Sequence, residues 1–262
     1  MRARLRGWLV LGYTSLSMVF FFLLSLPEML VHGTGHLAIW LARFAWSPSI
    51  LWLAGVRVEV ARTPSLPDGP LIFACNHESA LDILALLSVL PRAVRFVAKR
   101  ELFQIPIFGW YMRIGGHIEV DRQHHAQAIA SLRAAGQTIR AGTSLIVFPE
   151  GTRSKDGHVH PFKKGPFVVA MEAGVPVVPV AISGAGRINP KKHIAVYPGT
   201  IRIALADPVD PRACADRTAL LVEVRRRVIE MHRTIGGLGG DPDDAVAAPG
   251  VEGSSKAPAD AV

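Results

Sequence analysis

From Val56 onward, short apolar runs the length of a strand alternate with segments the length of a helix. These runs predict strands at residues 56–60, 71–75, 94–98, 117–120, 144–148, 176–182, 194–197 and 200–206. Helices are expected at residues 82–90, 124–141, 166–173 and 214–235, and a loop with a helix at residues 99–115. Strands that alternate with helices in this way indicate an α/β fold with a largely parallel sheet flanked by helices on both faces.

Residues with polar or charged side chains follow several of the predicted strands directly. Sites in sheets of this class gather at the carboxyl ends of the strands. The segments at those ends are His77, Asp121-Arg122 and Phe148-Pro149-Glu150. We therefore expect the functional site at this edge of the sheet.

The N-terminal segment is apolar and long. Residues 7–26 carry no charge, and Arg2, Arg4 and Arg6 precede them. Twenty apolar residues are enough to cross a bilayer, at about 1.5 Å per residue against about 30 Å of hydrocarbon. Because no Ala-x-Ala cleavage site follows, the segment is predicted to be an uncleaved anchor, with its arginines on the cytoplasmic side.

A second apolar segment, residues 37–53, is interrupted by Arg43 and Pro48. It is predicted to be an interfacial or re-entrant helix whose arginine reaches the headgroups, or else the second arm of a helical hairpin. Residues 1–53 are therefore expected to anchor the chain, and their deletion to release a folded domain at 54–235. Residues 236–262, rich in Gly, Pro, Ala and Ser, are expected to lie outside the fold.

Composition narrows the choice of partners. The formal net charge of +8 favours anionic partners, such as a lipid surface or a phosphorylated substrate. Nucleic acid is disfavoured because no basic stripe is interleaved with aromatic residues. Cys75 and Cys214 lie far apart, and the pair His32 and His36 has no third ligand nearby, so neither a disulfide nor a metal site is predicted.

The segment 76–82, Asn-His-Glu-Ser-Ala-Leu-Asp, lies between a predicted strand and a predicted helix. Positions five apart on a helix differ by roughly 140° of azimuth, so His77 must lie in the turn if it is to meet Asp82. Asp82 then accepts one imidazole N–H, and the other ring nitrogen is available to take a proton from a substrate hydroxyl. Alternatively, Asp82 caps the following helix and His77 is a turn residue.

The segment 148–154, Phe-Pro-Glu-Gly-Thr-Arg-Ser, has the composition of an anion pocket. Gly151 allows close backbone approach, Thr152 supplies a hydroxyl and Arg153 a cation. Lys99 and Arg122 follow two other strands, where they suit phosphate, although solvation of Lys99 and pairing of Arg122 with Asp121 are open alternatives. An apolar surface, which lines an acyl tunnel, contacts lipid or packs in the core, is formed by Phe103, Ile105, Ile107, Phe108 and Trp110.

Five blocks occur in a fixed order at residues 76–82, 99–109, 115–122, 148–154 and 175–181. In this order they resemble the lysophosphatidic acid acyltransferase family, whose signature begins with Asn-His-x-Ser-x-x-Asp. Asn76, His77, Ser79 and Asp82 match that signature, and the block at 148–154 matches completely. The resemblance covers about residues 56–206.

This resemblance implies transfer of an acyl group from acyl-CoA or acyl-carrier protein to a lysophospholipid, 1-acylglycerol 3-phosphate, which gives phosphatidic acid. His77 is then the catalytic base and Asp82 its partner. Phosphate binding falls to Lys99, Arg122 and Arg153, and substrate contacts also to Glu150, Gly151 and Thr152. No cofactor is implied, and the enzyme is expected at the inner (cytoplasmic) membrane with its catalytic domain facing the cytoplasm.

Three alternatives to this function stay open. The acceptor can be glycerol 3-phosphate, another lysophospholipid or a lyso-aminolipid. The chain can instead be a non-catalytic membrane protein that binds lipid, although binding alone needs neither His77 nor Asp82. A thioester hydrolase acting through Ser79 is the third.

Overall fold

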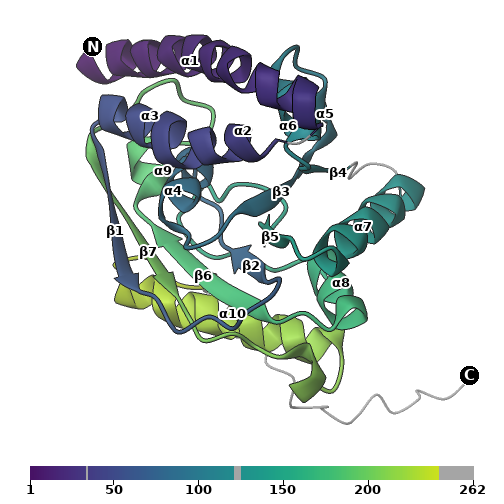
Figure 1. Ribbon diagram of the computed structural model, residues 1–262. Coiled ribbons are helices and arrows are strands. Elements are labelled where there is room, and N and C mark those ends of the chain that lie inside the picture. The colour runs from purple at the N-terminus through teal and green to yellow at the C-terminus, as the bar shows by residue number, and fades with distance from the viewer. Residues whose placement is uncertain (34, 121–124, 242–262) are drawn as a thin grey trace, which may run out of the picture.

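The computed structural model describes the chain except for residue 34, residues 121–124 and residues 242–262. Within that part of the chain, seven strands form one sheet in the order β1-β7-β6-β2-β5-β3-β4 (Figure 1). The strands are β1 (Val56–Arg62), β2 (Ile72–Cys75), β3 (Val94–Lys99), β4 (Ile118–Val120), β5 (Ser144–Val147), β6 (Val177–Ser183) and β7 (Gly199–Leu205). Neighbours from β6 to β4 pair in parallel, whereas β7 is antiparallel to β6 and parallel to β1. The predicted α/β fold with a largely parallel sheet is confirmed.

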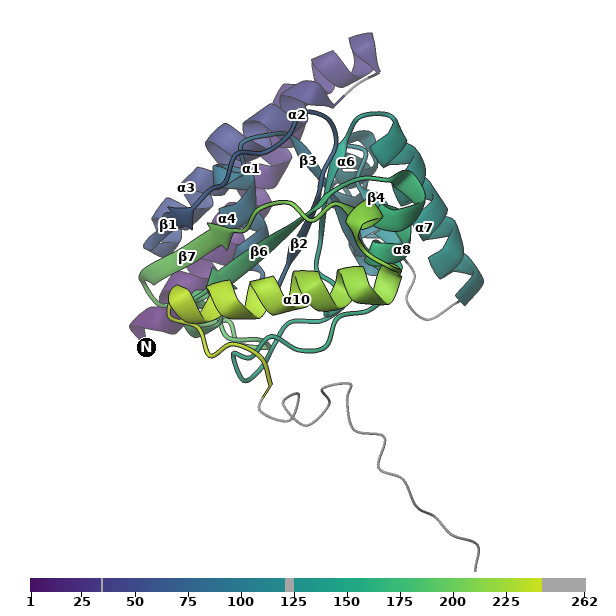
Figure 2. The same cartoon turned by 90° about the horizontal axis from the view of Figure 1, so that it is seen from below.

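Alternate side chains of each central strand enter two different hydrophobic cores. In β2, Phe73 and Cys75 belong to the core under the helices α3 (Ser47–Ala54) and α4 (Leu81–Val89). Ile72 and Ala74 belong to the core on the opposite face. That face is covered by α7 (His125–Arg140), α8 (Gly165–Ala173) and α10 (Arg217–Thr234), as Figures 1 and 2 show. Because both faces of β2 are buried, the strand appears in the sequence as a continuous apolar run.

The strand expected at residues 194–197 is absent, and this prediction was wrong. The Val196 N–H donates to the carbonyl of Ala3, at the start of α1 (Arg2–His32). Gly7 on α1 lies so close that a Cβ there would sit 1.6 Å from the carbonyl oxygen of Ile194. Val196 is buried because the segment packs along a helix, not because it pairs with a strand, and Tyr197 at its end is exposed.

The two N-terminal apolar segments are both helical. The second runs from α2 (His36–Leu41) through a π-helical turn at Ala42–Trp46 into α3. The π turn precedes Pro48, which lacks the N–H that a regular helix would use, so the helix passes the proline without a break. Both segments are long and apolar enough to cross a membrane by length and composition, and α1 lies alongside α2 and α3 (Figure 1).

The expected boundary after residue 53 does not separate two cores. Ile50, Leu51 and Ala54 are buried in the same cluster as Phe73 and Leu86 of the α/β domain. Deletion of residues 1–53 would expose that face of the domain, and the release of a folded domain by this deletion stays a prediction.

Arg43 likewise turns inward rather than toward headgroups. Its guanidinium donates to the carbonyl of Leu90, at the C-terminal end of α4. A cation at this place complements the partial negative charge of the helix end. The second apolar segment is thus tied to the domain through a charged side chain as well as through packing.

The fold also extends past residue 235, the last residue of the expected domain. The Gly239 carbonyl accepts a hydrogen bond from the Val159 N–H at 2.8 Å, and the Gly239 N–H donates to Nδ1 of His232 at 3.1 Å. Gly240 forms a bridge with Val159. A tail of this composition has no apolar pattern, but its backbone groups supply the partners.

We expect truncation to have different effects in the two parts of this tail, residues 236–241 and residues 242–262. Removing residues 242–262 is expected to leave the melting temperature unchanged. Removing residues 236–262 should lower it by several degrees, because each lost buried hydrogen bond costs about 1 kcal/mol and each kcal/mol shifts Tm by about 2 to 4 °C in a chain of this size. Scanning calorimetry of the two truncated proteins decides this, and equal melting temperatures would contradict it.

Candidate active site

The candidate site is built on the turn between β2 and α4. The turn is held from one side by Asn76, whose side chain makes two hydrogen bonds with the backbone of Ile182 in β6. Asn76 Nδ2 donates to the Ile182 carbonyl at 2.8 Å, and its Oδ1 accepts from the Ile182 N–H at 2.7 Å. The turn at the carboxyl edge of the sheet is therefore anchored to the neighbouring strand.

His77 and Asp82 meet within this turn. His77 Nδ1 lies 2.7 Å from Asp82 Oδ2. The same oxygen accepts the backbone N–H groups of Glu78 at 2.7 Å and Ser79 at 2.9 Å. Asp82 is fully buried, and this burial raises its pKa while the hydrogen bond from His77 opposes the shift. Asp82 is thus the partner of His77 and also holds the turn, but it does not cap the following helix, whose N-cap Ala80 has no side-chain hydrogen bond.

This contact determines which nitrogen of His77 is available. Because Asp82 Oδ2 is an acceptor, Nδ1 carries the proton and Nε2 carries the lone pair. Within the residues described, no hydrogen bond to Nε2 is present, and the side chain remains 16% exposed. The ring stacks on Phe148, with centroids 4.0 Å apart, which fixes its plane. The lone pair on Nε2 suits a general base.

The block at 148–154 follows β5, the neighbour of β2. Its backbone meets the turn directly, since the Ser154 N–H donates to the His77 carbonyl at 2.7 Å. Glu150 Oε1 accepts the His77 N–H at 2.9 Å. Burial, with smaller contributions from Asp82 and Glu78, raises the pKa of Glu150 to about 8. Glu150 thus supports the backbone of His77, where the sequence predicted a contact with substrate.

A lysine that the sequence did not single out joins this block. Lys191 Nζ donates to Thr152 Oγ1 at 2.8 Å and to the Arg153 carbonyl at 2.6 Å. The pKa of Lys191 is lowered by desolvation and by the cations Lys155, Arg153 and Lys192. A gathering of like charges of this kind is favourable once an anion binds among them. In the sequence, the feature that points to this contact is the pair of consecutive lysines, Lys191 and Lys192, after the strand at 176–182.

Gly151 occupies a position in this block that other residues would strain. Its φ is +75°, and a Cβ would lie 2.9 Å from Cε of Lys163. The glycine therefore lets a further lysine approach the backbone of the block. Its place beside an anion stays a prediction.

Lys99 and the Ser79 hydroxyl have partners outside the block at 148–154. Lys99 is half exposed at the end of β3 and forms an ion pair with Glu101 at 2.6 Å. Arg122 lies outside the described residues. Ser79 is fully buried, and its hydroxyl donates to the Asn189 carbonyl at 3.1 Å. This hydrogen bond directs the hydroxyl away from the role of a nucleophile.

A cavity of about 350 Å³ adjoins the turn. It lies between the N-terminal helices on one side and α4, β3 and α6 (Phe108–Ile114) on the other, and Ala80 and Asn189 line it next to the turn. Its volume lies within the range of ligand pockets, about 300 to 1,000 Å³. Of the five apolar residues predicted at 103–110, Phe108 lines this cavity, whereas Phe103 is buried elsewhere and Ile105 and Trp110 are exposed.

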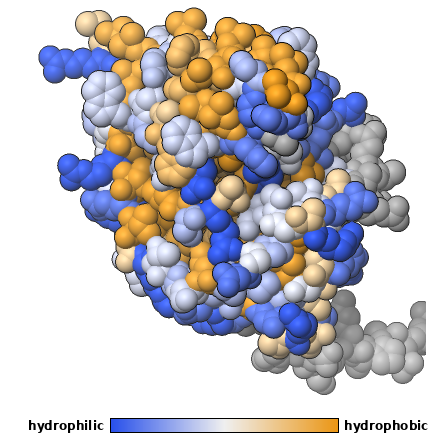
Figure 3. Space-filling view, viewed as in Figure 1, coloured by the Kyte–Doolittle hydropathy of each residue, from blue (hydrophilic) through white to orange (hydrophobic). Residues whose placement is uncertain are grey.

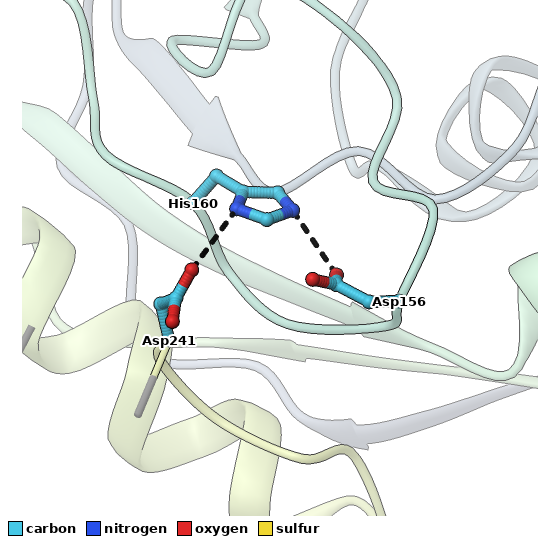
Figure 4. A group of neighbouring side chains, drawn as sticks. All are labelled: Asp156, His160 and Asp241. Atoms are coloured by element: carbon cyan, nitrogen blue, oxygen red, sulfur yellow. Dashed lines mark ion pairs between the residues drawn. The ribbon is translucent and has the colours of Figure 1, made fainter. Parts of the chain in front are cut away.

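One group in the described residues has the composition of a metal site. Asp156, His160 and Asp241 place one possible ligand atom each within 4.8 Å of one another. Figure 4 shows that the two carboxylates face different nitrogens of the same ring, at 3.0 Å for Asp156 and 3.7 Å for Asp241. This is the geometry of an ion-pair network that ties the C-terminal segment to the loop at 156–160.

Comparison with known proteins places this chain in a family. The acyltransferase family model matches residues 57–183. The chain is 34% identical to the 1-acyl-sn-glycerol-3-phosphate acyltransferase alpha of Mus musculus over 212 residues, 78% of this chain and 74% of the relative. It is 33% identical to the 1-acyl-sn-glycerol-3-phosphate acyltransferase of Pseudomonas aeruginosa, over 72% of each chain. The chain spans about half the length of the plant and algal relatives that it matches.

The fold is shared as well. The crystal structure of the 1-acyl-sn-glycerophosphate acyltransferase PlsC from Thermotoga maritima superposes with a TM-score of 0.80 at 28% identity. The match covers 89% of this chain and 96% of that one, so it extends beyond the sheet into the N-terminal helices. With identity above 30% across more than two thirds of the animal and bacterial relatives, this chain belongs to the 1-acyl-sn-glycerol-3-phosphate acyltransferase family.

Proposed function

We propose that this protein transfers a fatty acyl group from acyl-CoA or acyl-carrier protein to the free hydroxyl of 1-acylglycerol 3-phosphate, forming phosphatidic acid. One observation carries the proposal. His77, oriented by Asp82 at 2.7 Å, presents the lone pair of Nε2 in a turn that adjoins both an apolar cavity and a group of cations. These are the parts that acyl transfer to a phosphorylated acceptor requires.

The proposed reaction proceeds through His77 without an acyl-enzyme intermediate. Nε2 takes the proton of the acceptor hydroxyl while the oxygen attacks the thioester carbonyl, and the buried carboxylate of Asp82 stabilises the imidazolium that forms. The tetrahedral intermediate then collapses, and the C–S bond breaks. The departing thiolate takes the proton back from Nε2, which leaves a free thiol, the new ester and neutral His77.

Binding is divided between the cavity and the cations. The apolar cavity takes an acyl chain, because nearly all of its lining is hydrocarbon. Arg153 and Lys191 neutralise the phosphate, and Arg153 offers a planar fork for two of its oxygens. Lys99 and Arg122 remain proposed phosphate ligands by their place after the strands.

The N-terminal helices are the proposed membrane contact. Orange side chains cover the side of the molecule where α1 to α3 lie (Figure 3). Large apolar residues exposed on these helices include Trp8, Leu9, Leu16, Phe20, Leu23, Leu24, Leu30, Val31, Trp40, Phe44 and Trp52. We place these helices in the inner membrane with the domain on the cytoplasmic side, where the arginines before residue 7 meet anionic headgroups.

Product analysis tests this function. Purified full-length protein receives one acyl-CoA, or the same acyl group on acyl-carrier protein, with a panel of acceptors. The panel contains 1-acylglycerol 3-phosphate, glycerol 3-phosphate, a neutral lysophospholipid and a lyso-aminolipid. Phosphatidic acid, detected by mass spectrometry, is the expected main product. Preferential acylation of another acceptor would replace the proposed substrate, and free fatty acid alone would indicate a hydrolase.

Substitution of Arg153 tests whether this residue contributes to substrate binding or to the chemical step. Its replacement by alanine is expected to raise KM for 1-acylglycerol 3-phosphate about ten- to a hundredfold, because a charge-assisted hydrogen bond contributes roughly 1.5 to 3 kcal/mol. The value of kcat should change little, since the phosphate does not react. Arg153→Lys should recover part of the affinity, because lysine keeps the charge but not the fork.

A charge-matched control accompanies these variants. Arg212 is an exposed cation that pairs with Asp210, so Arg212→Ala lowers the net charge equally without touching the block at 148–154. Its KM should stay at the wild-type value. If Arg153→Ala instead lowers kcat with KM unchanged, Arg153 belongs to the reacting group and not to the phosphate pocket.

A further inference from the structure

Glu78 follows His77 directly and has an unusual environment for a charged turn residue. It is 7% exposed, and each of its carboxylate oxygens has a partner. Oε2 accepts the Gly186 N–H at 2.9 Å, in α9 (Ala185–Ile188), and Oε1 lies 3.1 Å from Nε2 of His232 in α10. Burying a carboxylate costs free energy unless hydrogen bonds replace its contacts with water, so buried carboxylates have such partners.

His232 has a defined tautomer. It is fully buried, and its Nδ1 accepts the Gly239 N–H at 3.1 Å. A ring nitrogen that accepts a hydrogen bond carries no proton, so the proton of the ring is on Nε2, which donates to Glu78. The orientation of this pair therefore depends on the backbone of the C-terminal segment.

The C-terminal segment, residues 236–241, closes over His232. A Cβ at Gly237 would lie 2.3 Å from Nε2 of His232, so this residue must be glycine for the segment to pass. The same segment pairs with Val159 through its glycines 239 and 240, and with His160 through Asp241 (Figure 4). Residues 159 and 160 continue from the block at 148–154. One segment thus contacts the loop of that block and, through His232, the turn of His77.

We propose that Glu78 and His232 are positioning residues, which hold the turn so that Nε2 of His77 faces the acceptor hydroxyl. The inference rests on the proposed function, and neither residue touches substrate. Glu78 donates its own N–H to Asp82 Oδ2, so a shift of residue 78 moves the oxygen that orients His77. Misplacement of a reacting group by about 1 Å can cost about 10²-fold in rate.

Glu78→Gln tests the pair with almost no change of shape. If the amide oxygen faces His232, the amide NH₂ meets the Gly186 N–H; if the amide is flipped, the NH₂ meets Nε2–H of His232. In either orientation two donors face each other, so kcat should fall up to about 10²-fold with KM little changed. The double variant Glu78→Gln, His232→Glu should restore much of kcat, because a carboxylate at position 232 accepts from both the new amide NH₂ and the Gly239 N–H.

His232 is tested with a matched pair of substitutions. His232→Gln keeps a donor for Glu78 and an acceptor for the Gly239 N–H, so it should retain most of kcat. His232→Leu removes both and should reduce kcat as Glu78→Gln does. Should the leucine variant fail to fold, truncation after Gly237 removes the Gly239 donor and is expected to lower kcat in the same direction.

Loss of stability alone is excluded by a control on the same helix. Val228→Ala opens a cavity at a fully buried position of α10 without touching Glu78, so it should lower the melting temperature and leave kcat unchanged. Wild-type kcat in Glu78→Gln and His232→Leu, with only their melting temperatures lowered, overturns the positioning role. Failure of the proposed function gives a different result from failure of the positioning role. In that case the wild-type protein would transfer no acyl group in the same assay.

Discussion

Replacing His77 by alanine is expected to reduce kcat by about 10²- to 10⁴-fold, the usual contribution of a positioned general base. The loss follows from the geometry at Nε2, which is the lone pair that the turn presents. His77→Gln should be equally inactive, because an amide can keep the hydrogen bond to Asp82 but cannot take up a proton at neutral pH. Initial rates with saturating 1-acylglycerol 3-phosphate measure both.

The fold should survive these two substitutions. The contacts that tie residue 77 to Glu150 and Ser154 are made by its backbone N–H and carbonyl, which every residue other than proline supplies. His158→Ala is the matched control, since that imidazole lies beside Asp156 and outside the proposed chemistry. Near-normal turnover in His77→Ala, with its circular dichroism and melting temperature unchanged, would remove His77 from the mechanism.

Replacing Asp82 by asparagine is expected to lower kcat nearly as far, since the same change in the serine-protease triad costs about 10⁴-fold. The asparagine oxygen can still accept the three donors that surround Oδ2, from His77, Glu78 and Ser79. What is lost is the negative charge that stabilises the imidazolium. The melting temperature of Asp82→Asn should therefore stay close to that of the wild-type protein while its kcat falls.

Asp82→Ala provides the contrast. It leaves the backbone N–H groups of Glu78 and Ser79 without the acceptor that they share, and a buried unsatisfied donor costs about 1 to 3 kcal/mol. This variant should lose stability as well as activity. Wild-type kcat in Asp82→Asn would show that the charge is not needed, and that Asp82 serves the turn alone.

Much of the fold follows from local patterns. The alternating and continuous apolar runs predicted every strand of the described sheet, because the period of side chains along a strand is a property of the chain itself. The exception at residues 194–197 is instructive, since the same apolar pattern serves a segment that packs against α1. Periodicity identifies an apolar segment, but it does not identify the partner against which that segment packs.

The contacts of the site also differ in whether the sequence predicts them. The meeting of His77 with Asp82 was predictable, because five residues in one turn leave few arrangements. The contact of Glu150 with the His77 N–H and that of Lys191 with Thr152 were not, because they join residues that are 73 and 39 positions apart. Such contacts depend on which strands become neighbours, and β2 lies between β5 and β6 only in the folded sheet.

The sequence by itself determined the α/β class, the places of the strands and the turn that pairs His77 with Asp82. Only the tertiary structure decided that α3 shares the core of the domain, that Glu78 meets His232 across 154 residues of chain, and that Gly239 belongs to the fold. The physical reason is that periodicity and turn chemistry act over a few residues, whereas the partner of a buried polar group is set by packing of the whole chain.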